Sequence, residues 1–354
     1  MSRDGNSIPL TVLSVAYPLM TVGPDAGGGA EQILHLVDQG LVHAGMRSLV
    51  IAAKGSNVQG QLIATPAATG EITEAIRNEA HKGHALRIAT VLAQNKVDLI
   101  HYHGLDFFSY WASHSDVPQL ATLHLPVDWY PPAIFGNPGF SMNCVSKTQV
   151  ASVPENHSIP VIANGIRVHS FHFAPVKQDY LLWLGRVCPE KGTDIALSIA
   201  HHLNLPLFIA GPVHPFPTHE AYFVEQIKPF LDDSRCYLGP VGLKKKSELL
   251  ANARCLLVPS LAAETSSLVS MEALSSGTPV IAFRSGALPE IIESGVTGFI
   301  VDSEEEMAQA VTRTKEISSK ICRSVAENRF TSDRMLSGYL DLYSSLIARA
   351  AVRV

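Results

Sequence analysis

The 354-residue sequence contains little charge, and this shortage already limits what the protein does. Charged residues make up 17% of the chain, below the usual share of about 25%, while apolar residues make up 46%. That balance excludes intrinsic disorder and predicts a compact chain with large buried sheets. The formal net charge of −5 argues against a general polyanion-binding surface, so we expect no nucleic-acid partner.

The sequence also lacks paired cysteines. Its five cysteines are scattered along the chain, at Cys144, Cys188, Cys236, Cys255 and Cys322. Their spacing predicts neither a disulfide framework nor a zinc site, and reduced thiols are typical of a cytoplasmic protein.

Long apolar runs are missing as well. The start of the chain is polar at Arg3–Asn6, and the run Leu10–Ala16 is too short for a signal peptide or a membrane span. We therefore expect a cytoplasmic protein with no integral membrane segment. The stretch Glu71–Lys96 mixes acids and bases and offers no strongly basic membrane-docking face, although transient contact with a lipid acceptor stays open.

What the sequence does contain is a regular alternation of apolar runs and helical patterns. Continuous apolar runs predict strands covered on both faces, at 10–16, 48–53, 97–103, 120–124, 140–145, 180–184, 207–210, 255–258, 279–283 and 298–301. Amphipathic patterns predict helices at 30–44, 73–94, 194–203, 246–253, 268–275 and 332–349. This alternation predicts an α/β fold of parallel sheets joined by right-handed crossovers.

The alternation restarts near residue 180, after a Pro- and His-rich stretch at 161–175 that we interpret as a linker. Length alone favours about two domains. We predict an N-terminal Rossmann-like domain at 1–167, a C-terminal Rossmann-like domain at 168–330, and a crossover helix at 331–354. Ligands are expected in a cleft that faces the carboxyl ends of both sets of strands.

The stretch from Pro259 to Ala282 is the most informative. A strand ends at Pro259, a loop carries Glu264, and a helix begins near Ser266 with backbone amides free to bind an anion. Glu264 and Glu272 are eight residues apart, or about 12 Å along a helix, whereas a double-displacement glycosidase needs about 5.5 Å. They can instead bracket a long ligand with an anionic centre. Taken alone, Glu264 can be a charge at the N-terminus of a helix, and Glu272 can be a solvated surface residue.

A second loop follows the strand at 180–184 and carries Arg186 and Lys191. Arginine binds phosphate through two parallel hydrogen bonds, and lysine adds a point charge. Opposite the helix terminus at Ser267 the two cations would hold a diphosphate. The alternative is a solvated basic loop.

These motifs together resemble the retaining glycosyltransferases of family four, which have the GT-B fold. Glu264-x7-Glu272 with the following Ala-Leu-x-x-Gly-Thr-Pro-Val-Ile-Ala resembles the family signature. The similarity extends in order from about residue 10 to the C-terminus, through Gly27–Glu31, Asp98–Gly104, Ile162–Ile166, Gly185–Gly192, Gly286–Glu290 and Gly295–Phe299.

The resemblance implies a role for each matching residue of the C-terminal half. Arg186 and Lys191 would hold the donor diphosphate, Glu272 the ribose hydroxyls, and Glu264 would face the donor sugar. The remaining implied donor contacts are main-chain groups, at Gly28, Gly29, Val241 within the nucleobase loop Gly239–Gly242, Ser267, Leu268 and Val269. The last helix, from Ser332, would cross back onto the N-terminal domain.

The chain departs from the family where relatives carry Gly-Phe-Gly, because it has Thr265-Ser266-Ser267. Added side chains in this space affect the choice of donor sugar. A catalytically silent sugar-nucleotide binder therefore stays an alternative, as does a sugar-nucleotide epimerase on the same fold.

In the N-terminal half, His124 ends a strand and would lie near the anomeric carbon. His101 and His103 are expected to serve the scaffold, with His103 also a candidate acceptor contact. Asp128, Trp129 and Tyr130 are candidate acceptor-binding residues, since exposed aromatic rings stack on sugars; a packed Pro-aromatic loop is the alternative. The run Lys244–Lys246 is expected to be a solvated helix start.

The predicted reaction moves a sugar from a nucleoside-diphosphate sugar to a hydroxyl acceptor with retention and without a metal or cofactor. No Asp-x-Asp pair occurs, so the cations and the helix terminus would replace the divalent ion. The departing phosphate would help to deprotonate the acceptor on the same face. Family frequency favours uridine as the base. A dehydrogenase is discounted, since Gly23–Gly29 lacks the dinucleotide-binding spacing.

Overall fold

The computed structural model describes residues 9–67, 72–155 and 157–353. The residues behind the signal-peptide argument, Arg3–Asn6, and the first residue of the stretch Glu71–Lys96 lie outside these ranges. The chain divides into two compact units. Unit 1 comprises the described residues of Met1–Cys144, Val153–Ile162 and Leu336–Val354, and unit 2 comprises Val145–Ser152 and Ala163–Met335.

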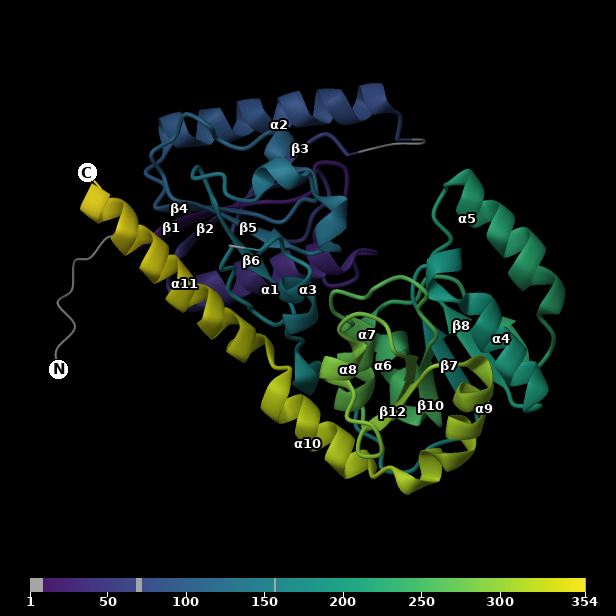
Figure 1. Cartoon of the computed structure of the whole chain (residues 1–354). Coiled ribbons are helices and arrows are strands. Elements are labelled where there is room, and N and C mark those ends of the chain that lie inside the picture. Colours follow the sequence, from purple (N-terminus) through teal and green to yellow (C-terminus); the bar gives the residue numbers. More distant parts are fainter. Residues whose placement is uncertain (1–8, 68–71, 156, 354) are drawn as a thin grey trace. The chain divides into compact units, whose positions relative to one another are not determined.

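Unit 1 contains a six-stranded parallel sheet in the order β3-β2-β1-β4-β5-β6. Its strands are β1 (Thr11–Val15), β2 (Arg47–Ala53), β3 (Gln61–Thr65), β4 (Leu99–Tyr102), β5 (Gln119–Leu123) and β6 (Ser141–Cys144). Helices α1 (Gly29–His43) and α2 (Glu74–Gln94) lie on opposite faces of the sheet (Figure 1). This is the doubly wound order in which the chain reverses direction between β1 and β4.

Unit 2 repeats the same order in its own strands, as β12-β11-β10-β7-β8-β9, all parallel. They are β7 (Leu181–Leu184), β8 (Leu207–Ala210), β9 (Arg235–Tyr237), β10 (Cys255–Val258), β11 (Val280–Phe283) and β12 (Gly298–Val301). The reversal point here lies between β7 and β10. Two sheets with this order confirm the predicted fold class.

Helices of unit 2 cover its sheet and bury a continuous apolar core. They are α4 (Thr193–His202), α5 (Pro217–Tyr222), α6 (Leu243–Asn252), α7 (Leu268–Ser275), α8 (Leu288–Ile291), α9 (Glu304–Arg313) and α10 (Ser319–Arg329). The short helix α3 (Lys147–Ala151) also belongs to unit 2 but contributes no residue to this core. None of the helices in the described ranges combines the length and the apolar composition that a bilayer span requires.

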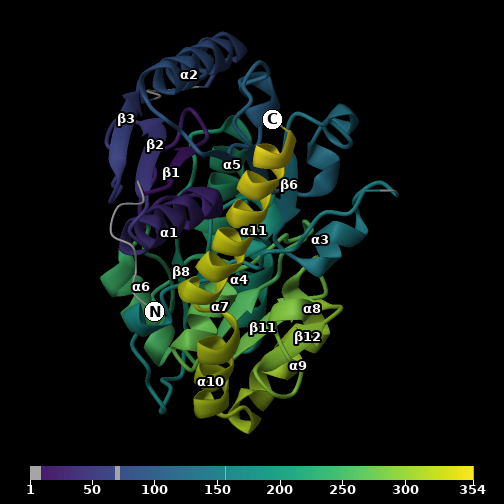
Figure 2. The same ribbon diagram turned by 90° about the vertical axis from the view of Figure 1, so that its left-hand side faces the viewer.

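The last helix, α11 (Ser332–Arg353), belongs to unit 1 from Leu336 onward. Figures 1 and 2 show it beside α1, where a Cβ on Gly40 would collide with Leu336. The hydroxyl of Tyr343 shares a 2.6 Å hydrogen bond with His101 Nδ1, and that of Tyr339 lies 3.1 Å from Thr122 Oγ1. These buried contacts join α11 to β4 and β5.

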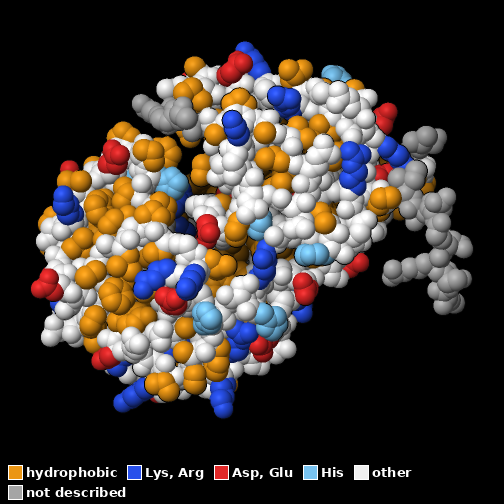
Figure 3. All heavy atoms as spheres, turned by 180° about the vertical axis from the view of Figure 1, so that it is seen from behind, with side chains coloured by type: hydrophobic (Ala, Val, Ile, Leu, Met, Phe, Trp, Pro, Cys, Tyr) orange, Lys and Arg blue, Asp and Glu red, His pale blue; other side chains and the backbone are white. Residues whose placement is uncertain are grey.

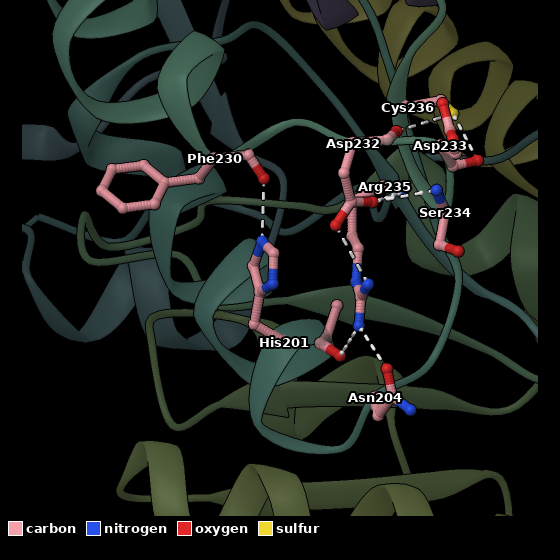
Figure 4. A network of polar contacts seen from close by, with 9 residues as sticks. His201, Asn204, Phe230, Asp232, Asp233, Ser234, Arg235 and Cys236 are labelled. Atoms are coloured by element: carbon pink, nitrogen blue, oxygen red, sulfur yellow. Dashed lines mark hydrogen bonds and ion pairs between the residues drawn. The ribbon is translucent and has the colours of Figure 1, made fainter.

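Neither β3 nor β9 is among the predicted strands, and each forms one edge of its sheet. The entry to β9 is instead fixed by a polar network (Figure 4). The guanidinium of Arg235 donates to Asp232, to the Ala200 carbonyl and to Asn204 Oδ1, at 3.1, 3.3 and 3.1 Å. The network therefore ties the end of α4 to the start of β9 far from any predicted site residue.

Surface charges carry no single sign on the face drawn in Figure 3, where Lys and Arg side chains are interspersed with Asp and Glu.

Candidate active site

The loops that follow β7 and β10 form the candidate site in unit 2. Because these strands are neighbours and parallel, both loops leave the same edge of the sheet at the reversal point, where such folds bind ligands. The first loop carries Arg186 and Lys191, and the second carries Glu264 and leads into α7. The topology thus brings together residues that lie some seventy positions apart in the sequence.

The backbone of Glu190 holds the two loops in register. Its carbonyl oxygen accepts hydrogen bonds from the Leu261 amide at 2.9 Å and from Ser260 Oγ at 3.3 Å. Gly192 follows in the left-handed region, with φ of 61°, and a Cβ there would collide with the Pro259 carbonyl. Only glycine permits this close approach without strain.

Lys191 and Glu264 form a direct ion pair between the loops. Lys191 Nζ donates to Glu264 Oε1 at 2.5 Å, and Ser260 Oγ donates to the same oxygen at 2.6 Å. The Lys191 carbonyl also accepts a 3.3 Å bond from the indole of the buried Trp183. The Arg186 side chain is exposed and has no hydrogen-bond or ion-pair partner within the described ranges. Its guanidinium is therefore available for an anionic ligand.

Gly286 fixes the backbone of Glu264 from the other side. Its φ is 51°, and a Cβ there would collide with the carbonyl oxygen of Glu264. The neighbouring amide of Ala287 donates to that oxygen at 2.7 Å, and Ser285 Oγ donates to the Ala262 carbonyl at 2.6 Å. The motif Gly286–Glu290 thus supports the carboxylate-bearing loop.

The N-terminus of α7 presents open backbone amides. Ser267 is the N-cap residue, but its side chain does not cap the helix and instead contacts Ser270 Oγ at 2.8 Å. The amides of Leu268 and Val269, in the first turn, have no acceptor within the helix, which is the usual state of an anion-binding terminus. Ser266 Oγ is buried and has no partner among the described residues. The Thr265-Ser266-Ser267 departure therefore leaves a free hydroxyl at this terminus.

Glu272 is 3% exposed, which rules out a solvated surface role. Its Oε1 accepts a 2.6 Å bond from Lys246 Nζ, while its Oε2 is buried without a partner in the described chain. Burial raises the pKa of this carboxyl, and the Lys246 charge opposes the rise. One oxygen thus remains to accept a ligand hydroxyl.

Lys246 is the site residue that the sequence analysis missed. The run Lys244–Lys246 was expected to be solvated, and this is wrong for Lys246, whose side chain is only 14% exposed. The spacing carried a signal, because Leu243, Ser247 and Leu250 set the inward face of α6 and Lys246 lies beside it.

The predicted nucleobase loop Gly239–Gly242 joins β9 to α6. Gly239 has φ of 70°, and neither Gly239 nor Gly242 has an atom within 4 Å of an added Cβ. Val241 packs partly against the core of unit 2. The loop thus has open space beside its backbone.

In unit 1, the predicted residues follow β1, β4 and β5. Gly28 is the N-cap residue of α1, and Gly29 begins that helix. His103 Nδ1 lies 3.1 Å from His124 Nε2, so the structure brings these two candidates together. Burial lowers the pKa of His124 to about 3 and that of His103 well below its ordinary value. Both rings are neutral at physiological pH.

The acceptor candidates in the next loop do not share one environment. Asp128 is exposed and Trp129 is 57% exposed, as a sugar-stacking ring requires. Tyr130 is 3% exposed, and its hydroxyl accepts bonds from the His124 and Leu125 amides at 3.0 and 3.3 Å. The expectation of an exposed Tyr130 ring is wrong. This residue instead supports the backbone of His124.

Comparison with known proteins defines the class of the fold. Residues 178–316 match the family model described as "Glycosyl transferases group 1". AviGT4, a glycosyltransferase involved in avilamycin A biosynthesis, superposes with a TM-score of 0.73 at 24% identity, over 96% of this chain and 98% of that one. Alr3699/HepE from Anabaena, solved with UDP-glucose, gives 0.74 at 18% identity over 95% and 100%. The chain has the GT-B fold of glycosyltransferases.

Curated relatives match through part of their length. D-inositol 3-phosphate glycosyltransferase of Corynebacterium efficiens is 31% identical over 146 residues, which is 39% of this chain and 34% of the relative. The chain spans less than half the length of the curated relatives it first matches. Residues 178–316, which the family model covers, include Arg186, Lys191, Glu264 and Glu272.

Proposed function

We propose that the protein transfers a sugar from a nucleoside-diphosphate sugar to a hydroxyl acceptor, with retention of anomeric configuration and without a metal or cofactor. One observation carries the proposal: the Lys191–Glu264 pair, the free Arg186 and the open amides of α7 all lie at one reversal point. The match to group 1 glycosyl transferases and the UDP-glucose complex of HepE support it.

Each group then has a chemical task. Cleavage of the anomeric bond leaves negative charge on the diphosphate, which Arg186, Lys191 and the α7 amides would stabilise. Glu272 Oε2 would accept a ribose hydroxyl. Glu264, which orients Lys191, would face the donor sugar, and Val241 would contact the base. Glu264 and Glu272, each paired with a lysine, are assigned to donor binding and not to nucleophilic attack. The departing phosphate would accept the acceptor proton.

The residues of unit 1 complete the proposal. Gly28 and Gly29 would approach the phosphates, His124 would lie near the anomeric carbon, and His103, Asp128 and Trp129 would contact the acceptor. Tyr130 would act through the His124 backbone. All five cysteines are unpaired in the structure, which supports a cytoplasmic site of action.

The test is a binding and product assay over a panel of UDP- and GDP-sugars. We expect calorimetric binding of one nucleotide and its release as diphosphate, either by transfer or by slow hydrolysis. The double variant Arg186→Ala/Lys191→Ala should lose nucleotide binding and diphosphate release. Arg313→Ala, which removes an exposed arginine paired to Glu316, should keep both. Proton NMR of the product anomer decides retention. Binding without release would indicate a silent binder, and conversion of the donor sugar an epimerase; either result contradicts the proposal.

A further inference from the structure

Three metal-ligating side chains converge behind the loop that carries Arg186. Cys188 and Glu190 belong to this loop, and His219 comes from α5, which follows the adjacent strand β8. One ligand atom from each residue lies within 4.8 Å of the other two. This group cannot be predicted from the sequence, because Cys188 has no nearby partner cysteine and His219 lies 29 positions after Glu190.

The side chains are poorly satisfied without a ligand. His219 is 9% exposed, and its Nδ1 is buried with no partner among the described residues. The buried Cys188 thiol donates to the Glu190 carboxylate, within this same group, and contacts the Arg186 carbonyl at 3.5 Å. A buried imidazole nitrogen without a partner is costly, so such a group usually has a ligand, an ion or a water. Glu190 is exposed and gives the cluster an opening to solvent.

We propose that Cys188, Glu190 and His219 bind a zinc ion. Thiolate and imidazole ligands select zinc over magnesium and calcium, which prefer oxygen ligands alone. The charges of the ion, the thiolate and the carboxylate sum to zero, so the ion can lie beside the cationic Arg186 and Lys191. Zinc takes four ligands. The fourth would be water or His214, whose ring centroid lies 6.3 Å from that of His219 and whose Nε2 is buried without a partner in the described ranges.

The ion would brace the loop rather than touch the donor. Glu190 contributes its carboxylate to the metal, while its carbonyl oxygen holds Leu261 and Ser260 of the neighbouring loop. Zinc would thus fix the backbone between Arg186 and Lys191. This role is separate from the metal-independent chemistry proposed above and does not depend on it.

Cobalt substitution tests the site without any substrate. Tag-free protein is stripped with chelator and titrated with Co²⁺, which gives a thiolate-to-cobalt charge-transfer band only when a cysteine binds it. We expect one equivalent to produce the band in the wild type, and Zn²⁺ to displace it. Cys188→Ser should abolish the band. Cys236→Ser is the matched control, because the Cys236 thiol makes only weak contacts with the Asp232 and Asp233 carbonyls, and it should keep the band.

Two further variants separate ligand loss from misfolding. Glu190→Gln changes an exposed side chain and should weaken zinc at least tenfold in competition with a chromogenic chelator. His219→Ala should do the same while keeping the far-UV circular dichroism of the wild type. Absence of a band in the wild type, or its persistence in Cys188→Ser, overturns the proposal. Since nucleotide binding is assayed separately, failure here leaves the proposed function untouched, and the reverse also holds.

Discussion

Lys246 Nζ donates a 2.6 Å hydrogen bond to Oε1 of Glu272 and so joins α6 to α7 in the interior of unit 2. The ammonium also lies 5.6 Å from the ring centroid of Phe171. A buried carboxylate that loses its cationic partner is left as an uncompensated charge, which destabilises the folded state. The pair therefore ties the stability of unit 2 to the residue proposed to bind ribose.

Replacing Lys246 by methionine should lower the free energy of unfolding by about 3–5 kcal/mol at neutral pH, the usual cost of orphaning a buried charge. Urea denaturation measures it. Because burial raises the Glu272 pKa, the loss should shrink as the pH falls through that raised pKa and the carboxyl becomes neutral. Lys246→Met/Glu272→Gln should recover most of the loss. A deficit that is the same at all pH values would contradict this account.

Arg186→Ala should lower kcat/KM about a hundredfold, or roughly 3 kcal/mol of transition-state stabilisation, since a preorganised cation at the leaving group is lost. Lys191→Ala should cost a similar factor. Steady-state kinetics with the preferred donor measure both, with Arg313→Ala as the control. Unchanged kinetics in the double variant Arg186→Ala/Lys191→Ala would mean that this loop does not bind the diphosphate.

Gly286→Ala should sharply lower activity, because a Cβ there collides with the Glu264 carbonyl and strains a residue with φ of 51°. Gly295→Ala is the matched control: its φ is 81°, but nothing lies within 4 Å of an added Cβ. Both variants carry backbone strain, so both should lose about 1 kcal/mol or more of stability. Only Gly286→Ala should also lose turnover; equal kinetics in the two would mean that Glu264 needs no such support.

The free energy of unfolding should decrease as the pH falls below about 6.5. His124 has a pKa of about 3 in the folded chain and near 6.5 when unfolded, so the unfolded state binds more protons in this window. Each such histidine contributes a slope of about 1.4 kcal/mol per pH unit. Denaturation at pH 5 and 7 should show a smaller difference in His124→Gln than in the wild type. An equal difference in the two proteins would mean that a group other than His124 causes the loss of stability at low pH.

Turnover should survive excess EDTA, since cations and helix amides replace a catalytic metal. Activity is measured before and after chelation, with each metal added back separately. A partial loss restored by Zn²⁺ alone would point to the Cys188 site. Complete loss restored by Mg²⁺ or Mn²⁺ would contradict the proposed chemistry.

Most strands were predictable because parallel strands buried on both faces need continuous apolar runs. The edge strand β3 is not buried on both faces, because Gln61 is exposed and Leu62 and Ile63 are half-buried. The three residues of β9 are too few to form a pattern, and a network of side chains fixes their position. The edge strands β3 and β9 are thus set by tertiary contacts that a local sequence pattern does not record, whereas the edge strands β6 and β12 contain apolar runs and were predicted.

The candidate site was predictable where loop order follows strand order. Arg186, Lys191 and Glu264 were assigned from motifs, and the topology brings them to one edge. Lys246 was not, since its burial depends on Glu272, 26 positions away, while its lysine neighbours are exposed. Tyr130 was misjudged for a similar reason, because the partners of its hydroxyl are backbone amides that the sequence does not reveal.

The return of α11 to unit 1 has a consequence for biosynthesis. His101 and Thr122 emerge from the ribosome 242 and 217 residues before their partners Tyr343 and Tyr339. Domains usually acquire their structure in the order of synthesis. Unit 1 cannot complete these contacts until α11 has been made, whereas the strands of unit 2 are complete by Val301, so unit 2 can fold before the interior of unit 1 is closed.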